Sequence, residues 1–167
     1  MGERITYSSD GLKLSGILAT PTNPGGSRVP GVVLVPGFMS TADAFFPGFA
    51  EALNAAGFVS LTLDFRGFGE SEGVRGEVIP YLQIYDASNA ISYLQSRPEV
   101  NPDQIALLGV SLGGGEVAYI QLATDESSVW PQWSWSVMAS GECDDFEPSR
   151  SGTRSCKRFK RTGYTGF

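Results

Sequence analysis

The chain has 167 residues, of which 41% are hydrophobic and 18% charged, a size and composition typical of one folded domain with a buried core. Its net charge of −6 disfavours nucleic acid and anionic membranes as partners, because phosphate groups are bound by clustered Lys and Arg side chains. No apolar segment near the start resembles a signal peptide or is long enough to span a bilayer, so we expect a cytoplasmic protein.

Strand and helix signals alternate along the first three quarters of the chain. We expect strands at Ile5–Tyr7, Leu12–Leu18, Gly31–Val35, Phe58–Leu63 and Ile105–Leu108, and helices at Ala44–Ala56, Ile79–Arg97 and Gly114–Thr124. Asp10-Gly11 is a strong hairpin signal, so the first two strands should be antiparallel. The later alternation requires parallel strands with right-handed crossovers. The predicted fold class is therefore α/β, with a mostly parallel sheet and an antiparallel N-terminal strand.

Several residues define the ends and faces of these elements. The continuous β-branched run at Gly31–Val35 predicts a central strand covered on both faces. In the first helix, apolar residues recur with helical spacing at Phe45, Phe49, Leu53 and Ala56, and Gly57 is placed as its C-terminal cap. Pro98 should end the second helix, and Asn101–Asp103 should turn the chain into the next strand.

A serine stands at the centre of the stretch Gly109-Val110-Ser111-Leu112-Gly113, between the last predicted strand and the last predicted helix. A serine at the apex of so tight a bend occupies strained backbone, and the crowding of strand and helix requires glycine at Gly109 and Gly113. The exposed hydroxyl could attack a carbonyl, and the first amides of the helix would face the resulting oxyanion. The alternative is a tight strand-to-helix turn that carries no chemistry.

Other candidate sites are weaker. Gly67-Phe68-Gly69 is followed by Gly73, one position too far for GxGxxG, and the chain contains no GxxxxGK, so we expect a packed loop rather than a phosphate site. Cys143 and Cys156 fit neither a disulfide scaffold nor, without histidine, a zinc pattern. We predict no metal and no cofactor.

Three motifs in this order resemble the α/β-hydrolase superfamily, and most of all its esterase, dienelactone-hydrolase and serine-aminopeptidase-like groups. They are Val35–Phe38, Asp64–Ser71 and Gly109–Gly113, and the resemblance covers about Glu3 to Asp125. It implies the hydrolase fold, truncated after the helix that follows the fifth strand.

The same resemblance assigns roles to individual residues. Ser111 would be the nucleophile, and the backbone amides of Phe38 and Leu112 would form the oxyanion hole. Arg66 would brace the loops near the site without being catalytic. Many members have His-Gly where this chain has Pro36-Gly37, which need not abolish the chemistry because that histidine is not the general base.

The chain departs from the superfamily after residue 125. Three further strand-helix units, carrying the acid and the histidine of a catalytic triad, would be expected there, yet all three tryptophans fall in Trp130–Trp135 and the chain contains no histidine at all. Residues 1–141 carry a net charge of −8 and residues 142–167 a net charge of +2. We therefore divide the chain into a hydrolase core, 1–125, and an atypical tail, 126–167. The tail is a disordered basic segment, a nucleic-acid arm or, as we favour, the product of a shifted reading frame near Glu126.

These observations predict a serine hydrolase that acts on ester or related acyl bonds of a small molecule. Without a histidine to accept the serine proton, this chain should be inactive or very weakly active, and no lysine is placed to substitute for it. The alternative is a non-catalytic hydrolase-fold remnant that binds a ligand or a partner. If the tail adds no strand, Ile105–Gly109 becomes an exposed sheet edge that favours self-association.

Overall fold

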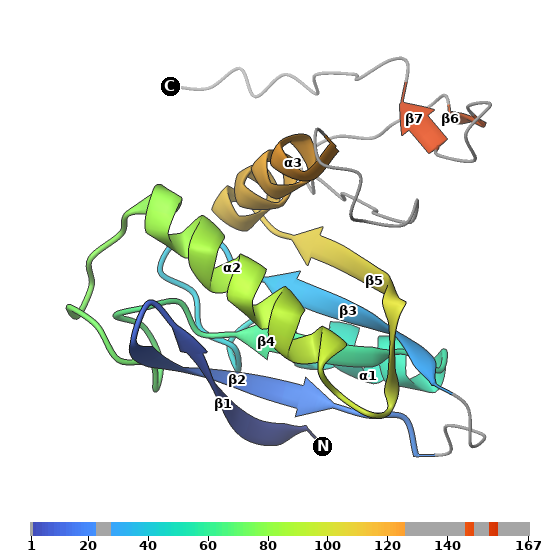
Figure 1. The fold of residues 1–167 in the computed structure, drawn as a ribbon, viewed down its shortest axis with the longest axis horizontal. Coiled ribbons are helices and arrows are strands. Elements are labelled where there is room, and N and C mark those ends of the chain that lie inside the picture. The colour runs from blue at the N-terminus through green and yellow to red at the C-terminus, as the bar shows by residue number, and fades with distance from the viewer. Residues whose placement is uncertain (1, 23–27, 126–145, 149–153, 157–167) are drawn as a thin grey trace, which may run out of the picture.

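The computed structural model describes residues 2–22, 28–125, 146–148 and 154–156, with the backbone alone for 123–125 and for the last two segments. The elements are β1 (Glu3–Ser9), β2 (Leu12–Ala19), β3 (Val29–Val35), α1 (Pro47–Ala55), β4 (Val59–Leu63), α2 (Pro80–Gln95), β5 (Val100–Gly109), α3 (Leu112–Asp125), β6 (Phe146–Pro148) and β7 (Arg154–Cys156). Strands β1 to β5 form one sheet, and β6 pairs with β7 in a separate antiparallel sheet (Figure 1).

The main sheet has the strand order β1-β2-β4-β3-β5. Strand β2 is antiparallel to both of its neighbours, β1 and β4, whereas β4, β3 and β5 are parallel. Asp10 and Gly11 both have positive φ, as the predicted hairpin turn between β1 and β2 requires. The predicted α/β-hydrolase class, with one antiparallel strand near the N-terminus, is confirmed.

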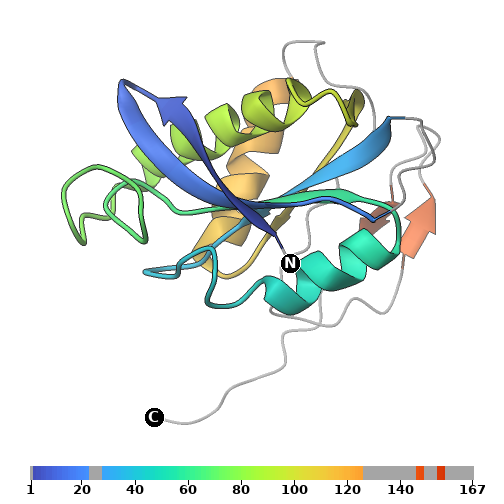
Figure 2. The ribbon, with the colours of Figure 1, turned by 90° about the horizontal axis from the view of Figure 1, so that it is seen from below.

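Helices cover both faces of the sheet. In Figure 2, α1 lies on one face, and α2 and α3 lie side by side on the other. Val33 and Val35 of β3 belong to the larger core cluster, which includes side chains of α2 and α3, whereas Val32 and Leu34 belong to a second cluster with Phe46. Strand β3 therefore contributes to a core on each side, as its continuous apolar run predicted.

Helix α1 starts later than expected. It begins at Pro47 rather than Ala44, because proline lacks an amide hydrogen and its fixed φ suits the first helical position. Phe45 is consequently outside the helix and 53% exposed, Phe49 is 44% exposed, and Phe46 is the buried aromatic side chain at 1%. The predicted start of the helix was therefore wrong, whereas Gly57 has the positive φ expected of a C-terminal cap.

Strand β5 is longer than expected. Val100 pairs with Val29, and a register shift before the Gly31–Ile105 pair accommodates the residues that were predicted to form a turn, Asn101–Asp103. Within this shift the Asp103 amide donates to Oδ1 of Asn101 at 3.1 Å, so the predicted local turn persists inside the strand. The strand ends at Gly109, directly before the serine turn.

The tail hypotheses lie outside the described residues, apart from the backbone of β6 and β7, so the frame shift near Glu126 stays a prediction. No helix in the described part of the chain is long and apolar enough to cross a membrane. The cytoplasmic location also stays a prediction.

Candidate active site

Ser111 occupies the turn between β5 and α3 in a strained conformation. Its φ is +55°, in the left-handed region that a residue with a β-carbon rarely adopts, and its side chain is exposed. The turn is held by the Gly113 amide, which donates to the carbonyl of Val110 at 3.0 Å, and by the Val110 amide, which donates to the carbonyl of Val35 at 3.2 Å. The serine is therefore presented at the carboxyl end of the sheet by backbone bonds to its neighbours.

Close packing of backbone explains the two glycines that flank the turn. A methyl group at Gly109 would overlap the carbonyl oxygen of Gly113 and lie 2.6 Å from the amide nitrogen of Gly114. At Gly113 it would overlap the carbonyl oxygens of Val35 and Pro36, at the end of β3, and lie 2.9 Å from the carbonyl carbon of Val35. Both positions thus permit α3 to start directly against the sheet, which the sequence analysis inferred from the motif alone.

The loop after β3 lies against the serine turn. A methyl group at Gly37 would be 3.0 Å from the carbonyl oxygen of Val110 and 3.3 Å from the β-carbon of Ser111, so the two backbones are in close contact. Phe38, the next residue, is 62% exposed. Met39 also has a positive φ, +55°, a strained position that sequence reasoning missed because no glycine marks it.

Leu112 is the first residue of α3, so its amide has no acceptor within the helix. The structure brings the proposed oxyanion donors, Phe38 and Leu112, onto the two chain segments that meet at Ser111. Among the described residues, no side chain is hydrogen-bonded to the Ser111 hydroxyl, and the whole chain contains no histidine. The backbone segments of Phe38, Ser111 and Leu112 therefore lie close together, and this chain has no imidazole that could accept the Ser111 proton.

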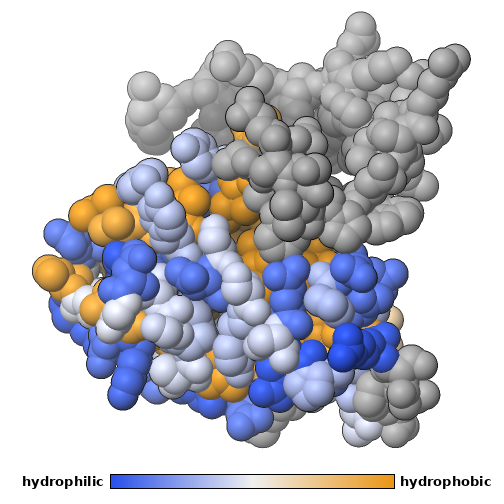
Figure 3. All heavy atoms as spheres, viewed as in Figure 1, coloured by the Kyte–Doolittle hydropathy of each residue, from blue (hydrophilic) through white to orange (hydrophobic). Residues whose placement is uncertain are grey.

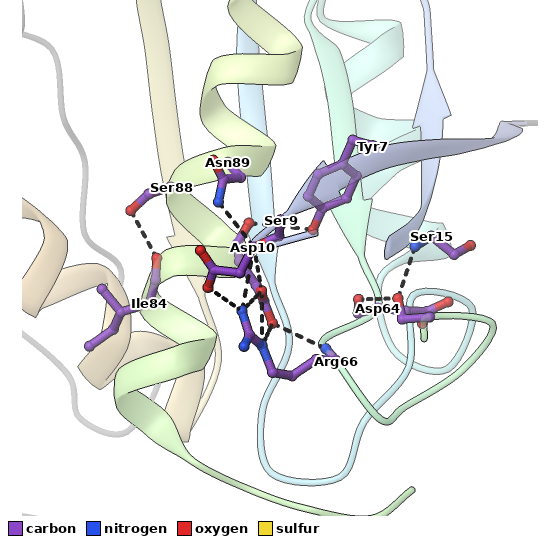
Figure 4. A network of polar contacts seen from close by, with 11 residues as sticks. Tyr7, Ser9, Asp10, Ser15, Asp64, Arg66, Ile84, Ser88 and Asn89 are labelled. Atoms are coloured by element: carbon purple, nitrogen blue, oxygen red, sulfur yellow. Dashed lines mark hydrogen bonds and ion pairs between the residues drawn. The ribbon is translucent and has the colours of Figure 1, made fainter. Parts of the chain in front are cut away.

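A buried ion pair supports the loop after β4. The Arg66 guanidinium donates to Asp86 of α2 at 2.7 Å and 3.0 Å, and its backbone amide donates to the same carboxylate at 3.1 Å (Figure 4). Ser9 donates to Asp86 at 2.7 Å, and Asp10 accepts a further bond from Arg66 at 3.0 Å. These carboxylates raise the pKa of Arg66 further. Arg66 thus joins the β1–β2 hairpin to α2, which agrees with a bracing role.

Asp64 connects this loop to the loop after β3. Its carboxylate is 1% exposed and accepts hydrogen bonds from the amide of Ala42 at 2.6 Å and from Arg4 at 3.0 Å. Its backbone carbonyl accepts a bond from Ser71 at 2.6 Å. Asp64 and Arg66 therefore fix the loops around Ser111 through buried, charge-assisted hydrogen bonds.

Glu116, on the second turn of α3, was not predicted as part of the site. It is 3% exposed, and neither carboxylate oxygen has a hydrogen-bond partner among the described residues. Burial, and secondarily the charge of Asp86, raises its pKa to about 8. An acidic residue on the buried face of a predicted helix was the available signal.

The sequence and the fold are similar to those of known proteins. Residues 28–138 match the family described as serine aminopeptidase, S33. An uncharacterized 31.7 kDa protein in the traX-finO intergenic region of Escherichia coli is 40% identical over 107 residues, which cover 63% of this chain and 37% of that protein. Thiohydrolase aneE of Aspergillus aculeatus is 38% identical over 119 residues, covering 67% of this chain and 36% of that protein.

The α/β-hydrolase GrgF from Penicillium sp. sh18 has a similar structure, with a TM-score of 0.67 and 30% identity over 72% of this chain and 41% of that one. The chain spans little more than a third of the two curated relatives, at 37% and 36% of their lengths. The family match, residues 28–138, contains β3 to β5 and the serine turn.

Proposed function

Because the chain belongs to the serine aminopeptidase S33 family of α/β-hydrolases, we propose that it carries the nucleophile of an acyl hydrolase, and that this nucleophile is Ser111. The observation that supports this most strongly is the φ of +55° at an exposed serine. Backbone strain of this kind costs about 1–3 kcal/mol. It persists only where the surrounding structure holds the residue in that conformation, and many such residues are in active sites.

The chemistry proposed is acyl transfer to the serine. Ser111 Oγ attacks the acyl carbon, and the amides of Phe38 and Leu112 donate to the oxygen that becomes negative. Collapse of the tetrahedral intermediate releases the alcohol or thiol and leaves an acyl-serine, which water then hydrolyses. Each step moves a proton to or from Oγ, the leaving group or water, and this chain has no imidazole to carry it.

We propose that the substrate is a small acyl ester or thioester. One relative in the shared region is named a thiohydrolase, which supports inclusion of thioesters. The 167-residue chain should turn such substrates over very weakly. In a serine protease, loss of the complete triad costs about 10⁶ in kcat and leaves a residual rate about 10³–10⁴ above that in water.

A fluorophosphonate probe tests the nucleophile directly. We expect slow labelling of the native chain at Ser111, located by mass spectrometry of the labelled peptide, and none of the Ser111→Ala variant. Labelling of both chains to the same extent, or at another residue, would contradict the proposal.

The absence of histidine favours a second candidate, a non-catalytic remnant that binds ligands through the same surface. The probe separates the two functions, because a remnant would leave Ser111 unlabelled even after long incubation. Hydrolysis of an aryl ester at rates usual for serine esterases, abolished in Ser111→Ala, would instead contradict the predicted weak activity.

We also propose that this chain self-associates along β5. Within the described part of the sheet, β5 pairs with β3 on one side and with no strand on the other. On the face in Figure 3, hydrophobic residues gather near α3 and the start of α2, where Leu122 is 73% and Ile79 38% exposed. Sedimentation velocity should show species larger than a monomer that increase with concentration, and a monomer throughout would overturn this proposal.

A further inference from the structure

Two buried side chains on neighbouring helices have oxygen atoms without a hydrogen-bond partner among the described residues. Glu116 of α3 and Gln83 of α2 are each 3% exposed. Both carboxylate oxygens of Glu116, and Oε1 of Gln83, have no hydrogen-bond partner within the described residues. Buried polar atoms in folded proteins nearly always have a partner, so these two orphan groups require an explanation.

The two groups belong to helices that pack against each other. Helices α2 and α3 pack side by side on the same face of the sheet (Figures 1 and 2). Gln83 lies three residues before Asp86 and, like it, is on the buried face of α2, and the charge of Asp86 acts on Glu116. This pair of helices therefore contains a buried amide oxygen that needs a donor and a buried carboxyl group that needs a partner.

The charges nearby favour a neutral Glu116. Arg66, the cation closest to Asp86, is committed to Asp86 and Asp10, and no salt bridge reaches Glu116 among the described residues. Burial and Asp86 raise the pKa of Glu116 to about 8, so the group carries its proton at neutral pH. A protonated carboxyl group has an O–H donor, which the Gln83 amide oxygen can accept.

We propose that Glu116 is a positioning residue that ties the nucleophile helix to α2: its protonated carboxyl donates a hydrogen bond to Oε1 of Gln83, and on ionisation this bond is lost and Asp86 repels the new charge. This hydrogen bond would hold α3 against α2 at a point five residues after Ser111. It supports the turn whether or not Ser111 acts as a nucleophile, so its test does not depend on the proposed function.

Among the charged groups on the elements packed against α3, Asp86 is the one whose charge acts on Glu116. The elements packed against α3 are α2, β5 and β3. Strand β3 has no titratable side chain. The remaining titratable side chains of α2 and β5 are Tyr81, Tyr85, Tyr93 and Asp103. Of these, Tyr81, Tyr85 and Asp103 are exposed, and the ring of Tyr93 packs at a tilt against Tyr7.

The sign of the pH effect follows from the raised pKa. Between the usual pKa of an unfolded Glu, about 4.3, and the folded value of about 8, the folded chain holds a proton that the unfolded chain has lost. Stability from this group is therefore fully present at low pH, falls as pH rises towards 8 and does not change further above it.

Urea unfolding at pH 6, 7, 8 and 9, in the native chain and in Glu116→Gln, tests the proposed pH-dependent hydrogen bond. The unfolding equilibrium constant of the native chain should rise by up to about tenfold per pH unit between pH 6 and 8, because one proton is released on unfolding. Glutamine keeps a donor for Gln83 but does not titrate, so the variant should match the native chain at pH 6 and lack this slope. The same slope in both chains would overturn the proposal.

The partner is tested by a double-mutant cycle with Gln83→Met and Glu116→Met, whose side chains are similar in size to those replaced. We expect the two changes to be coupled at pH 6 and additive at pH 9, and additivity at both pH values would overturn the assignment of Gln83. If unfolding is irreversible, infrared spectroscopy of the folded chain decides instead. A protonated-carboxyl band at pH 6 that Glu116→Gln lacks is expected, and its absence from the native chain would overturn the proposal.

Discussion

The loops that follow β4 and β5 lie at the same edge of the sheet but are built by opposite means. The loop after β4 buries its charged groups and provides partners for them, with Asp64 bound to Ala42 and Arg4, and Arg66 bound to Asp86. The turn after β5 exposes its serine and is shaped by the contact of Gly109 and Gly113 with neighbouring backbone. The first arrangement stabilises the fold, whereas the second places a strained residue where it can react.

The largest effect should come from the buried ion pair. Arg66→Met leaves Asp86, which is fully buried, without its cation, and should reduce the free energy of unfolding by about 3–5 kcal/mol. Replacement of both partners, in Arg66→Met with Asp86→Leu, should recover part of this loss, because no uncompensated charge remains. Urea unfolding at pH 7 measures the three variants.

The partly exposed pair Arg97–Glu99 is the matched control. Its atoms are 2.9 Å apart, but its side chains are 34% and 21% exposed, and Arg97→Gln should cost no more than about 1 kcal/mol. Equal losses in Arg66→Met and Arg97→Gln would show that the loop after β4 is not held by its buried charge.

An intermediate effect is expected for the glycines of the serine turn. Gly113→Ala brings a methyl group against the carbonyl oxygens of Val35 and Pro36, so it should destabilise the chain by about 1–3 kcal/mol. A methyl group at Gly115, two residues later on the same helix, would meet no neighbouring element within 4 Å, so Gly115→Ala should stabilise the chain by about 0.5–1 kcal/mol. Thermal unfolding of both variants gives the comparison. A shift of the same sign in both would mean that backbone contact does not shape the turn.

Much of the fold could be predicted from the sequence because its signals are local. Asp10-Gly11 specifies a hairpin turn, the run Gly31–Val35 specifies a strand buried on both faces, and Gly109 and Gly113 mark a turn that only small residues permit. The serine turn was located in this way without a structure. Each of these patterns depends on residues close together in the chain.

What could not be predicted depends on contacts between distant residues. Whether Phe45 or Phe46 is buried depends on where Pro47 starts α1 against β3, and the extension of β5 to Val100 depends on its pairing with Val29. Glu116 has ordinary helical spacing, and only the packing of α3 against α2 shows that its carboxyl group lacks a partner. Sequence patterns give the shape of the turn but not the polar environment behind it.

The smallest effect tests whether the serine turn stores strain. Ser111→Gly should stabilise the chain by up to about 1 kcal/mol, because glycine adopts a φ of +55° without steric cost, although its freedom in the unfolded chain offsets part of the gain. Ser111→Ala removes the same hydroxyl but keeps the β-carbon, so it should leave stability nearly unchanged. Both variants lose the nucleophile, so a difference between their unfolding midpoints reports the backbone alone. Equal midpoints would show that the surroundings do not hold Ser111 under strain, and the loops after β4 and β5 would then not differ in the way described above.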